Sequence, residues 1–233
     1  DDMEGNPDVD HMYGQTGQDD MIGGSRVPNR RDAGDFMYGG PDADFQLGDN
    51  GDLVREVTGF GQYRMYIEAN PSTIVRTSTR FDVIGSPLAF GNDQMWGDGG
   101  DDAQWGQNGD DIMHGGAEND DMIGELGSDR MYGEDGEDAM LGDRGGIVNR
   151  LIDGSPGDPA QFTVSLNSPP AETFVGFRNG TLDRRVDMRH DPNSTGTGFL
   201  TAVPAQPGTP VGGDDIMLGG NGRDSMHGGF GND

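Results

Sequence analysis

A strict period of nine residues runs through most of this 233-residue chain and constrains its fold more than any other feature. Between residues 106 and 142, glycine recurs at 106, 115, 124, 133 and 142, and Asp and Met keep fixed offsets inside each interval. When this glycine is numbered one, position six is always Asp: Asp1, Asp10, Asp19, Asp35, Asp44, Asp93, Asp102, Asp111, Asp120, Asp129, Asp138, Asp215, Asp224 and Asp233. A fixed period of this kind predicts a solenoid of stacked units.

Position eight of each unit is a large side chain, which indicates the inward face of a short strand. It is Met eleven times, as at Met113 and Met122, and Gln twice, at Gln46 and Gln104. In a strand of three residues, position eight then points inward and positions seven and nine point outward. The six preceding residues form a tight turn, where glycine supplies positive φ values at low cost.

The composition rules out a large conventional core. The chain has 43 glycines, 31% hydrophobic residues, no cysteine and a formal net charge of -27. Self-repulsion at this charge opposes compaction, so we expect the chain to fold only when cations neutralise it. The acidic charge argues against a nucleic-acid partner, and the lack of a long apolar run argues against membrane insertion. The chain starts without Met and stops within a repeat, so we expect it to be part of a longer polypeptide.

The repeat resembles the RTX (repeats-in-toxin) calcium-binding nonapeptide, G-G-x-G-x-D-x-U-x, in which U is a large apolar residue. The resemblance implies an all-β fold, a parallel β-roll in which two nonapeptides make one coil and Ca²⁺ lies between neighbouring turns. Carboxylate and carbonyl oxygens are the ligands that Ca²⁺ prefers. The predicted metal ligands are the aspartates at position six: Asp10, Asp19, Asp35, Asp44, Asp93, Asp102, Asp111, Asp120, Asp129, Asp138, Asp215, Asp224 and Asp233. Position four, where the family prefers Gly, is Asp8, Arg26, Asp42 or Glu118 in four units, and weaker sites are expected there.

Three insertions divide the repeats. We predict β-roll repeats at 1–51 with a small insertion at 26–33, a hairpin-like insertion at 52–91, repeats at 92–145, a larger β-rich insertion at 146–212 and repeats at 213–233. All three interrupt odd-numbered units counted from Gly5, so with two units per coil they should project from the same edge. The other edge should carry an unbroken ladder, namely Asp19, Asp44, Asp102, Asp120, Asp138 and Asp224.

The insertions differ from the repeats in charge and in residue type. They hold twelve of the 15 arginines, so they either dock on an acidic surface, their own or a neighbour's, or are small excursions packed on their own roll. The runs "QYRMYIEA", "STIVRTST", "QFTVSL" and "ETFVGF" favour short strands. The two long insertions start with the related sequences "GDNGDLV" and "GDRGGIV", 94 residues apart, which indicates duplication of a larger module.

Position nine is seldom polar although it points outward. On the odd strands it is largely aromatic, as in Tyr13, Tyr38 and Tyr132, and on the even strands largely aliphatic, as in Ile22 and Leu47. Such stripes usually mark a contact surface. Burial against protein, stacking on sugar rings and simple exposure all stay open for them.

No catalytic motif is found, so the chain is not expected to be an enzyme. The Asp pairs, such as Asp110 and Asp111, are explained by the repeat rather than by acid-base chemistry, and His190 beside Asp187 and Asp191 is a weaker candidate cation site. We expect a calcium-binding structural segment of a secreted or cell-surface protein, whose partners are copies of itself or other surface proteins in a layer, filament or adhesin. A folding and secretion module of a toxin or hydrolase, and a polysaccharide-binding module, are the alternatives.

Overall fold

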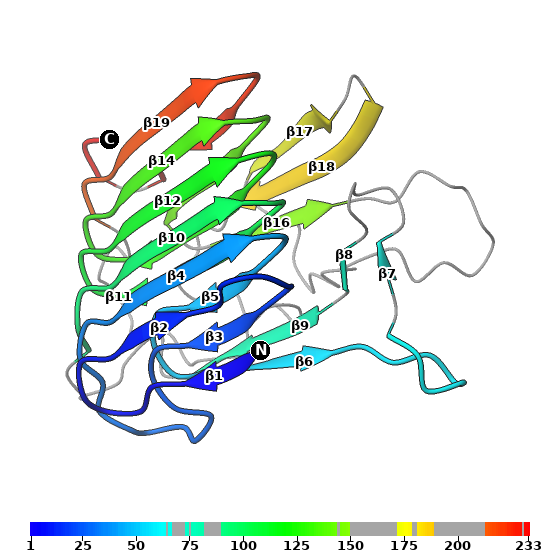
Figure 1. Ribbon diagram of the computed structural model, residues 1–233. Helices are drawn as coiled ribbons and strands as arrows, with labels where there is room; N and C mark the ends of the chain where they lie inside the picture. Colours follow the sequence, from blue (N-terminus) through cyan, green and yellow to red (C-terminus); the bar gives the residue numbers. More distant parts are fainter. Residues whose placement is uncertain are drawn as a thin grey trace.

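The computed structural model is an all-β solenoid and describes residues 1–63, 65–66, 73–74, 76–81, 90–143, 145–149, 172–178, 181–188, 213–229 and 231–233. Two parallel sheets face each other, and the chain passes from one to the other at every turn (Figure 1). Each coil therefore contains two nonapeptide units. The expected parallel β-roll is confirmed. No helix that could cross a membrane occurs in the described part of the chain.

The strands of the odd and even units separate into different sheets. The six-stranded sheet has the order β19 (Ile216–Asn221), β14 (Arg130–Asp135), β12 (Ile112–Ala117), β10 (Gln94–Gly99), β4 (Phe36–Pro41) and β2 (His11–Tyr13). The seven-stranded sheet has the order β1 (Asp2–Glu4), β3 (Asp20–Ile22), β5 (Phe45–Leu47), β11 (Ala103–Asn108), β13 (Asp121–Leu126), β15 (Ala139–Asp143) and β20 (Ser225–His227). Strands pair in repeat register, so that Met95 lies between Met37 and Met113.

A column of methionines fills the space between the two sheets. Met12, Met21, Met37, Met95, Met113, Met122, Met131 and Met140 are buried and form one cluster. Gln46 and Gln104 occupy the same column, and the Nε2 of Gln104 donates to the Oε1 of Gln46 at 2.8 Å. Position eight is thus the inward position, as the three-residue strand predicts. Met suits this narrow space because its side chain is unbranched and adaptable.

The turns depend on left-handed backbone at positions two and four. Gly109 and Gly127, at position four, have φ values of 135° and 136°, while Gln107 and Glu134, at position two, have φ values of 78° and 76°. Side chains other than Gly rarely adopt this conformation. Sequence reasoning anticipated positive φ in the turns but not that Gln and Glu would adopt it.

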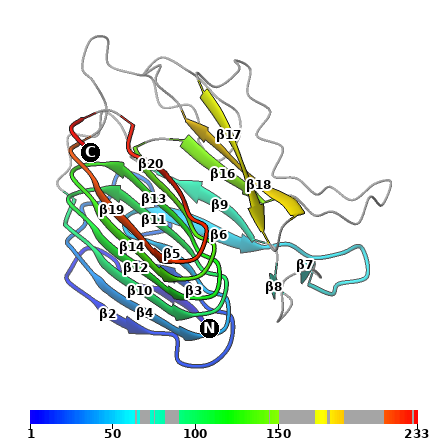
Figure 2. The ribbon, with the colours of Figure 1, turned by 90° about the horizontal axis from the view of Figure 1, so that it is seen from above.

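The three insertions start from the same edge, as unit parity predicts. Each one leaves a strand of the seven-stranded sheet, β3, β5 or β15, and returns to the six-stranded sheet at β4, β10 or β19. The two long insertions contain antiparallel strands: β6 (Gly51–Arg55) with β9 (Arg76–Arg80), β7 (Met65–Tyr66) with β8 (Thr73–Ile74), and β18 (Thr181–Met188) between β16 (Gly145–Asn149) and β17 (Glu172–Arg178). Strands β6, β16 and β18 contact strands of the seven-stranded sheet, and Figure 2 shows them on that side of the roll.

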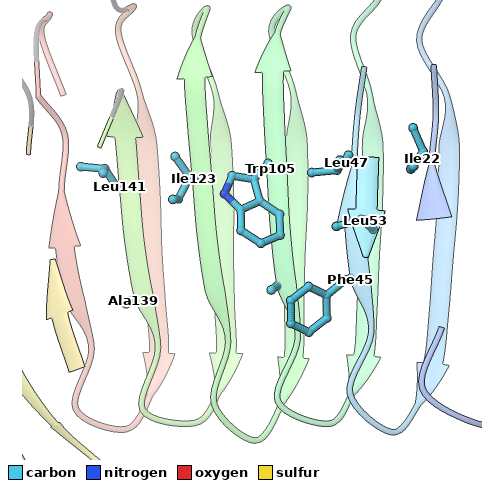
Figure 3. Packing of buried hydrophobic residues seen from close by; sticks show 9 residues of the cluster. Ile22, Phe45, Leu47, Leu53, Trp105, Ile123, Ala139 and Leu141 are labelled. Atoms are coloured by element: carbon cyan, nitrogen blue, oxygen red, sulfur yellow. The ribbon is translucent and has the colours of Figure 1, made fainter. Parts of the chain in front are cut away.

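The two outer faces differ because of these insertions. On the seven-stranded sheet, Ile22, Leu47, Trp105, Ile123 and Leu141 at position nine are buried in a cluster that includes Leu53 of β6 (Figure 3). The aliphatic stripe is therefore covered by the chain's own insertion. On the six-stranded sheet the aromatic stripe stacks on itself: the ring centroids of Tyr38 and Trp96 are 4.6 Å apart, and those of His114 and Tyr132 are 4.7 Å apart.

Arginines of the 52–91 segment dock on the roll. The Nε of Arg76 donates to the Oδ1 of Asp20 at 2.6 Å, and the guanidinium lies 4.5 Å from the ring centroid of Phe45. Arg80 forms an ion pair with Glu125, and both side chains are fully buried. This insertion thus docks on the acidic surface of its own roll. Three of the expected strands in the insertions are affected by the limits of the described residues: 161–166 lies wholly outside them, and 62–69 and 72–79 lie partly outside them.

Candidate metal sites in two ladders of buried aspartates

The position-six aspartates form two hydrogen-bonded ladders, one at each edge of the roll. In each ladder the backbone N–H of one aspartate donates to the Oδ1 of the aspartate in the next coil, over 2.6 to 3.2 Å. One ladder comprises Asp19, Asp44, Asp102, Asp120, Asp138 and Asp224, and the other comprises Asp10, Asp35, Asp93, Asp111, Asp129, Asp215 and Asp233. The second ladder is continuous although all three insertions interrupt its turns, which the sequence did not reveal.

The second carboxylate oxygen of many ladder residues is buried without a hydrogen-bond partner. This holds for the Oδ2 atoms of Asp19, Asp35, Asp44, Asp93, Asp102, Asp111, Asp129 and Asp215. A buried polar atom with no partner costs about 1–3 kcal/mol, and an isolated buried charge costs more. A row of such oxygens is not a stable arrangement unless a cation or a proton neutralises it. Asp10, Asp224 and Asp233, near the ends of the roll, are less buried.

The position-one glycines bring a second type of oxygen to the same place. A Cβ on Gly97 would collide with the Oδ2 of Asp102 and with the backbone carbonyl oxygen of Gly115 in the next coil. A Cβ on Gly124 would collide in the same way with Asp129 and with the carbonyl oxygen of Gly142. Carboxylate and carbonyl oxygens therefore converge beside each of these glycines, which explains why no side chain is accepted at position one.

Burial raises the pKa of the ladder carboxyls. The pKa of Asp35 rises to about 7 and that of Asp44 to about 8, in both cases chiefly because burial penalises the charged form. The pKa values of Asp93, Asp102 and Asp111 are raised well above the ordinary range for the same reason. Burial thus favours the protonated form of each of these carboxyls, and a bound cation would offset that penalty and favour the ionised form.

The donor set fits a hard cation that accepts backbone oxygens. No group of three or more Asp, Glu or His side chains gathers at one point among the described residues, because each turn contributes a single ladder aspartate. Zinc and other transition metals prefer nitrogen and sulfur ligands, whereas Ca²⁺ takes six to eight oxygens and readily uses carbonyls. The residues present therefore fit calcium.

Position-five side chains form further hydrogen-bonded ladders beside the two position-six ladders. Sequence reasoning missed them. The backbone N–H of Ser128 donates to the Oδ1 of Asp110 at 2.9 Å, and that of Asn119 donates to the Oδ1 of Asp101 at 3.0 Å. These position-five side chains explain the Asp pairs as a structural feature. The signal was present in the sequence, since position five is rich in Asp, Asn and Ser, which readily bond to backbone groups.

Two other sequence expectations have different outcomes. At position four, Asp42 and Glu118 adopt the left-handed backbone of the turn, with φ values of 87° and 77°, so these turns keep the shape of the repeat. Whether they bind a cation more weakly stays a prediction. His190, the weaker cation candidate, lies outside the described residues.

Solenoid coils, a narrow methionine core and oxygen-lined turns define a calcium-binding β-roll. The RTX calcium-binding nonapeptide repeat matches the chain in four copies, at residues 1–25, 90–113, 114–146 and 211–233. The repeats of this chain belong to that family, and the resemblance noted from the sequence is confirmed. A comparison with curated proteins found no match, and a comparison with solved structures found none either. The chain is accordingly a calcium-binding structural segment.

Proposed function

We propose that the two aspartate ladders bind Ca²⁺ between neighbouring coils and that this binding closes the roll. The supporting observation is the row of buried Oδ2 atoms without hydrogen-bond partners beside the position-one glycines. A bound cation supplies the positive charge that these carboxylates lack. Because the methionine column is thin, metal binding contributes a large share of the folding free energy.

The adjacent residues Asp110 and Asp111 provide a matched test. Both accept a backbone N–H through Oδ1, from Ser128 and Asp93 respectively, and an Asn side chain can keep that hydrogen bond. Only Asp111 is a buried ladder residue, whereas Asp110 is exposed. Far-UV circular dichroism during a calcium titration should show a cooperative coil-to-β transition that Asp111→Asn shifts to at least severalfold higher calcium. Asp110→Asn should leave the midpoint close to that of the unchanged chain. Equal midpoints for both variants would contradict the proposal.

A secreted or cell-surface location follows from the same coupling. Extracellular calcium is about millimolar, in the range of weak extracellular calcium modules, whereas cytosolic sensors work at micromolar levels or below. A chain with a net charge of -27 and few apolar residues would stay expanded inside the cell and close outside. In the principal alternative, a folding and secretion module, this calcium-triggered folding is the whole function.

The finer function that we favour is assembly through the outer face of the six-stranded sheet, with copies of the chain as the partner. The aromatic stripe and the neighbouring apolar residues lie on this face, where Tyr13, Ile216 and Leu218 are 54%, 48% and 56% exposed. Exposed apolar surface of this kind usually marks a contact. The stacked rings cover one another's faces, so the column does not favour sugar stacking and the polysaccharide alternative has less support.

Light scattering in calcium separates these alternatives. Growth in mass that is lost in an Ile216→Ser, Leu218→Ser double variant, with the circular dichroism transition retained, would support assembly through this face. A chain that folds with calcium but stays monomeric at all concentrations would favour the folding module instead.

A further inference from the structure

The position-two residues form a column along the edge from which the insertions leave. In coil order it comprises Asn6, Gly24, Asp49, Gln107, Glu125, Asp143 and Gly229. In uninterrupted units this position has positive φ, as in Asn6, Gln107 and Glu125. Asp49 and Asp143, at the start of the two long insertions, are not left-handed, and both side chains are buried. The sequence "G-D-x-G" shared by these two segments therefore marks a local geometry that differs from the ordinary turn.

Asp49 is a fully buried carboxylate that is only half satisfied. Its Oδ2 accepts hydrogen bonds from the backbone N–H of Asn108 at 2.9 Å and from the side-chain amide of Asn108 at 3.1 Å. Its Oδ1 is buried with no hydrogen-bond partner. Asp49 is not a position-six residue, although burial, the nearby ladder residues Asp93 and Asp111 and then Asp32 all raise its pKa.

Asp32, from the small insertion, fills the neighbouring place in this column. A Cβ on Gly24 would collide with the Oδ2 of Asp32 and would meet the Oδ1 of Asn50 at 2.8 Å, so the Asp32 carboxylate lies where a position-two side chain would be. Asp32 is 7% exposed and its Oδ2 has no hydrogen-bond partner. Because adjacent coils are about 4.8 Å apart, this places a second buried carboxylate next to Asp49.

Another buried carboxylate of the position-two column is paired with a positive charge, which Asp32 and Asp49 lack in the part of the chain that the structure describes. Glu125, two coils along from Asp49, is neutralised by the buried guanidinium of Arg80. Within the described ranges no ion pair joins Asp32 or Asp49 to a basic side chain, and both side chains are buried. Two adjacent buried carboxylates are costly unless a cation or a proton neutralises them.

We propose that Asp32 and Asp49 hold a calcium ion of their own, with the side-chain oxygen of Asn50 nearby, where the end of the 26–33 insertion meets the start of the 52–91 insertion. This inference rests on the proposed calcium function of the ladders but uses residues outside position six. The ion fastens the 26–33 segment to the roll, because Asp32 belongs to that segment, and Asn50 already donates to the carbonyl of Arg30 within it and accepts from the N–H of the preceding Ser25. The site thus substitutes for the ordinary turn that the insertion removes.

Calcium stoichiometry on the full chain tests this site. Equilibrium dialysis with elemental analysis would count the bound ions in the unchanged chain, Asp32→Asn, Asp49→Asn and the control Asp110→Asn. Hydrogen exchange of the 24–33 backbone, with calcium and with chelator, is the second readout. Each of the two site variants should lose one bound ion per chain and exchange its 24–33 amide hydrogens faster, while its circular dichroism transition stays at the calcium concentration of the unchanged chain. The control Asp110→Asn should keep the ion count and the exchange rates of the unchanged chain.

The outcomes distinguish this site from the ladders. An unchanged ion count with unchanged exchange in both variants would mean that these carboxyls are simply protonated, and would overturn the site while leaving the ladder function intact. No calcium-dependent transition in the unchanged chain would instead overturn the ladder function. If Asp49→Asn does not fold, Asp32→Asn decides alone, because Asp32 lies in an insertion and not in the repeats.

Discussion

At the scale of single residues, the turns accept glycine for two separable reasons. Gly17 and Gly109 both have left-handed backbone, with φ values of 109° and 135°. A Cβ on Gly17 would meet nothing within 4 Å, whereas a Cβ on Gly109 would collide with the backbone carbonyl of Gly91. Gly59 has neither constraint. Backbone conformation and close approach between coils can therefore be measured apart.

Alanine at these three glycines should give graded losses of stability in calcium. Gly17→Ala should cost about 1–2 kcal/mol through left-handed strain alone. Gly109→Ala should cost clearly more, because the coils must also move apart, and Gly59→Ala should be within about 0.5 kcal/mol of the unchanged chain. Urea unfolding at saturating calcium measures all three. Equal costs at Gly17 and Gly109 would mean that close approach of the coils contributes nothing.

Two glutamines inside the methionine column form a linked polar pair. The Nε2 of Gln46 donates to the backbone carbonyl of Trp96 at 3.0 Å, and the Nε2 of Gln104 donates both to Gln46 and to the carbonyl of His114. Gln104→Met alone should cost about 1–3 kcal/mol, because the Oε1 of Gln46 loses its partner. The double replacement of Gln46 and Gln104 by Met should be nearly neutral or stabilising. A double variant at least as damaged as the single one, in the same urea assay, would contradict this.

At the scale of elements, the 52–91 insertion is fastened to the seven-stranded sheet by arginines as well as by apolar contacts. Arg76 and Arg55 both bond to Asp20, and Arg80 pairs with Glu125. Leu53 adds an apolar contact to the covered stripe (Figure 3). The insertion therefore acts as a cover for one face of the roll and leaves the other face open.

Breaking the buried Arg80–Glu125 ion pair should show how much it contributes to fastening the 52–91 insertion to the seven-stranded sheet. Arg80→Met leaves Glu125 as an uncompensated buried charge, and we expect a loss of about 3–5 kcal/mol. The double variant Arg80→Met, Glu125→Gln should recover most of that loss, since no charge is left behind. Urea unfolding of the single and double variants in calcium gives the coupling free energy. Equal stability of Arg80→Met and the unchanged chain would show that the pair is not needed to hold the insertion.

Sequence reasoning succeeded where a feature repeats locally and failed where it depends on distant segments. The period of nine predicts the coil, the inward methionines and the register, because each unit has the same local geometry, and parity places the insertions at one edge. It does not predict that Arg80 meets Glu125 or that Asp32 fills the place beside Gly24, since insertions of unequal length bring these residues together. The candidate ladder residues were predictable, whereas Asp32 and Asp49 were not, because neither is at position six.

At the scale of the whole molecule, charge and fold oppose each other until a cation is bound. The net charge is -27, and both ladders place carboxylates in the interior. Among the described residues, the methionine column and the covered aliphatic stripe are modest apolar cores. Stability should therefore depend on both calcium and protons, since either one neutralises the ladders.

The response to pH should reverse when calcium is removed. In the metal-free roll, the pKa values of Asp35, Asp44 and Asp215 are about 7, 8 and 6, above the usual value near 3.8 of an unfolded chain. Below about pH 4 these carboxyls are protonated in both the folded roll and the unfolded chain, so they do not affect stability. Between about pH 4 and 8 the unfolded chain loses protons that the roll retains. The metal-free roll therefore loses stability as pH rises.

With calcium present the ligands must be ionised, so stability should instead rise over the same range. The folded fraction, followed by far-UV circular dichroism from about pH 4 to 8 in chelator and in calcium, would compare the two slopes, since in chelator the roll should form only where protons neutralise the ladders. Asp111→Asn should flatten the slope in chelator, because it removes one buried titrating group whose pKa is raised. Slopes of the same sign in both conditions would mean that the ladder carboxyls do not exchange protons for calcium.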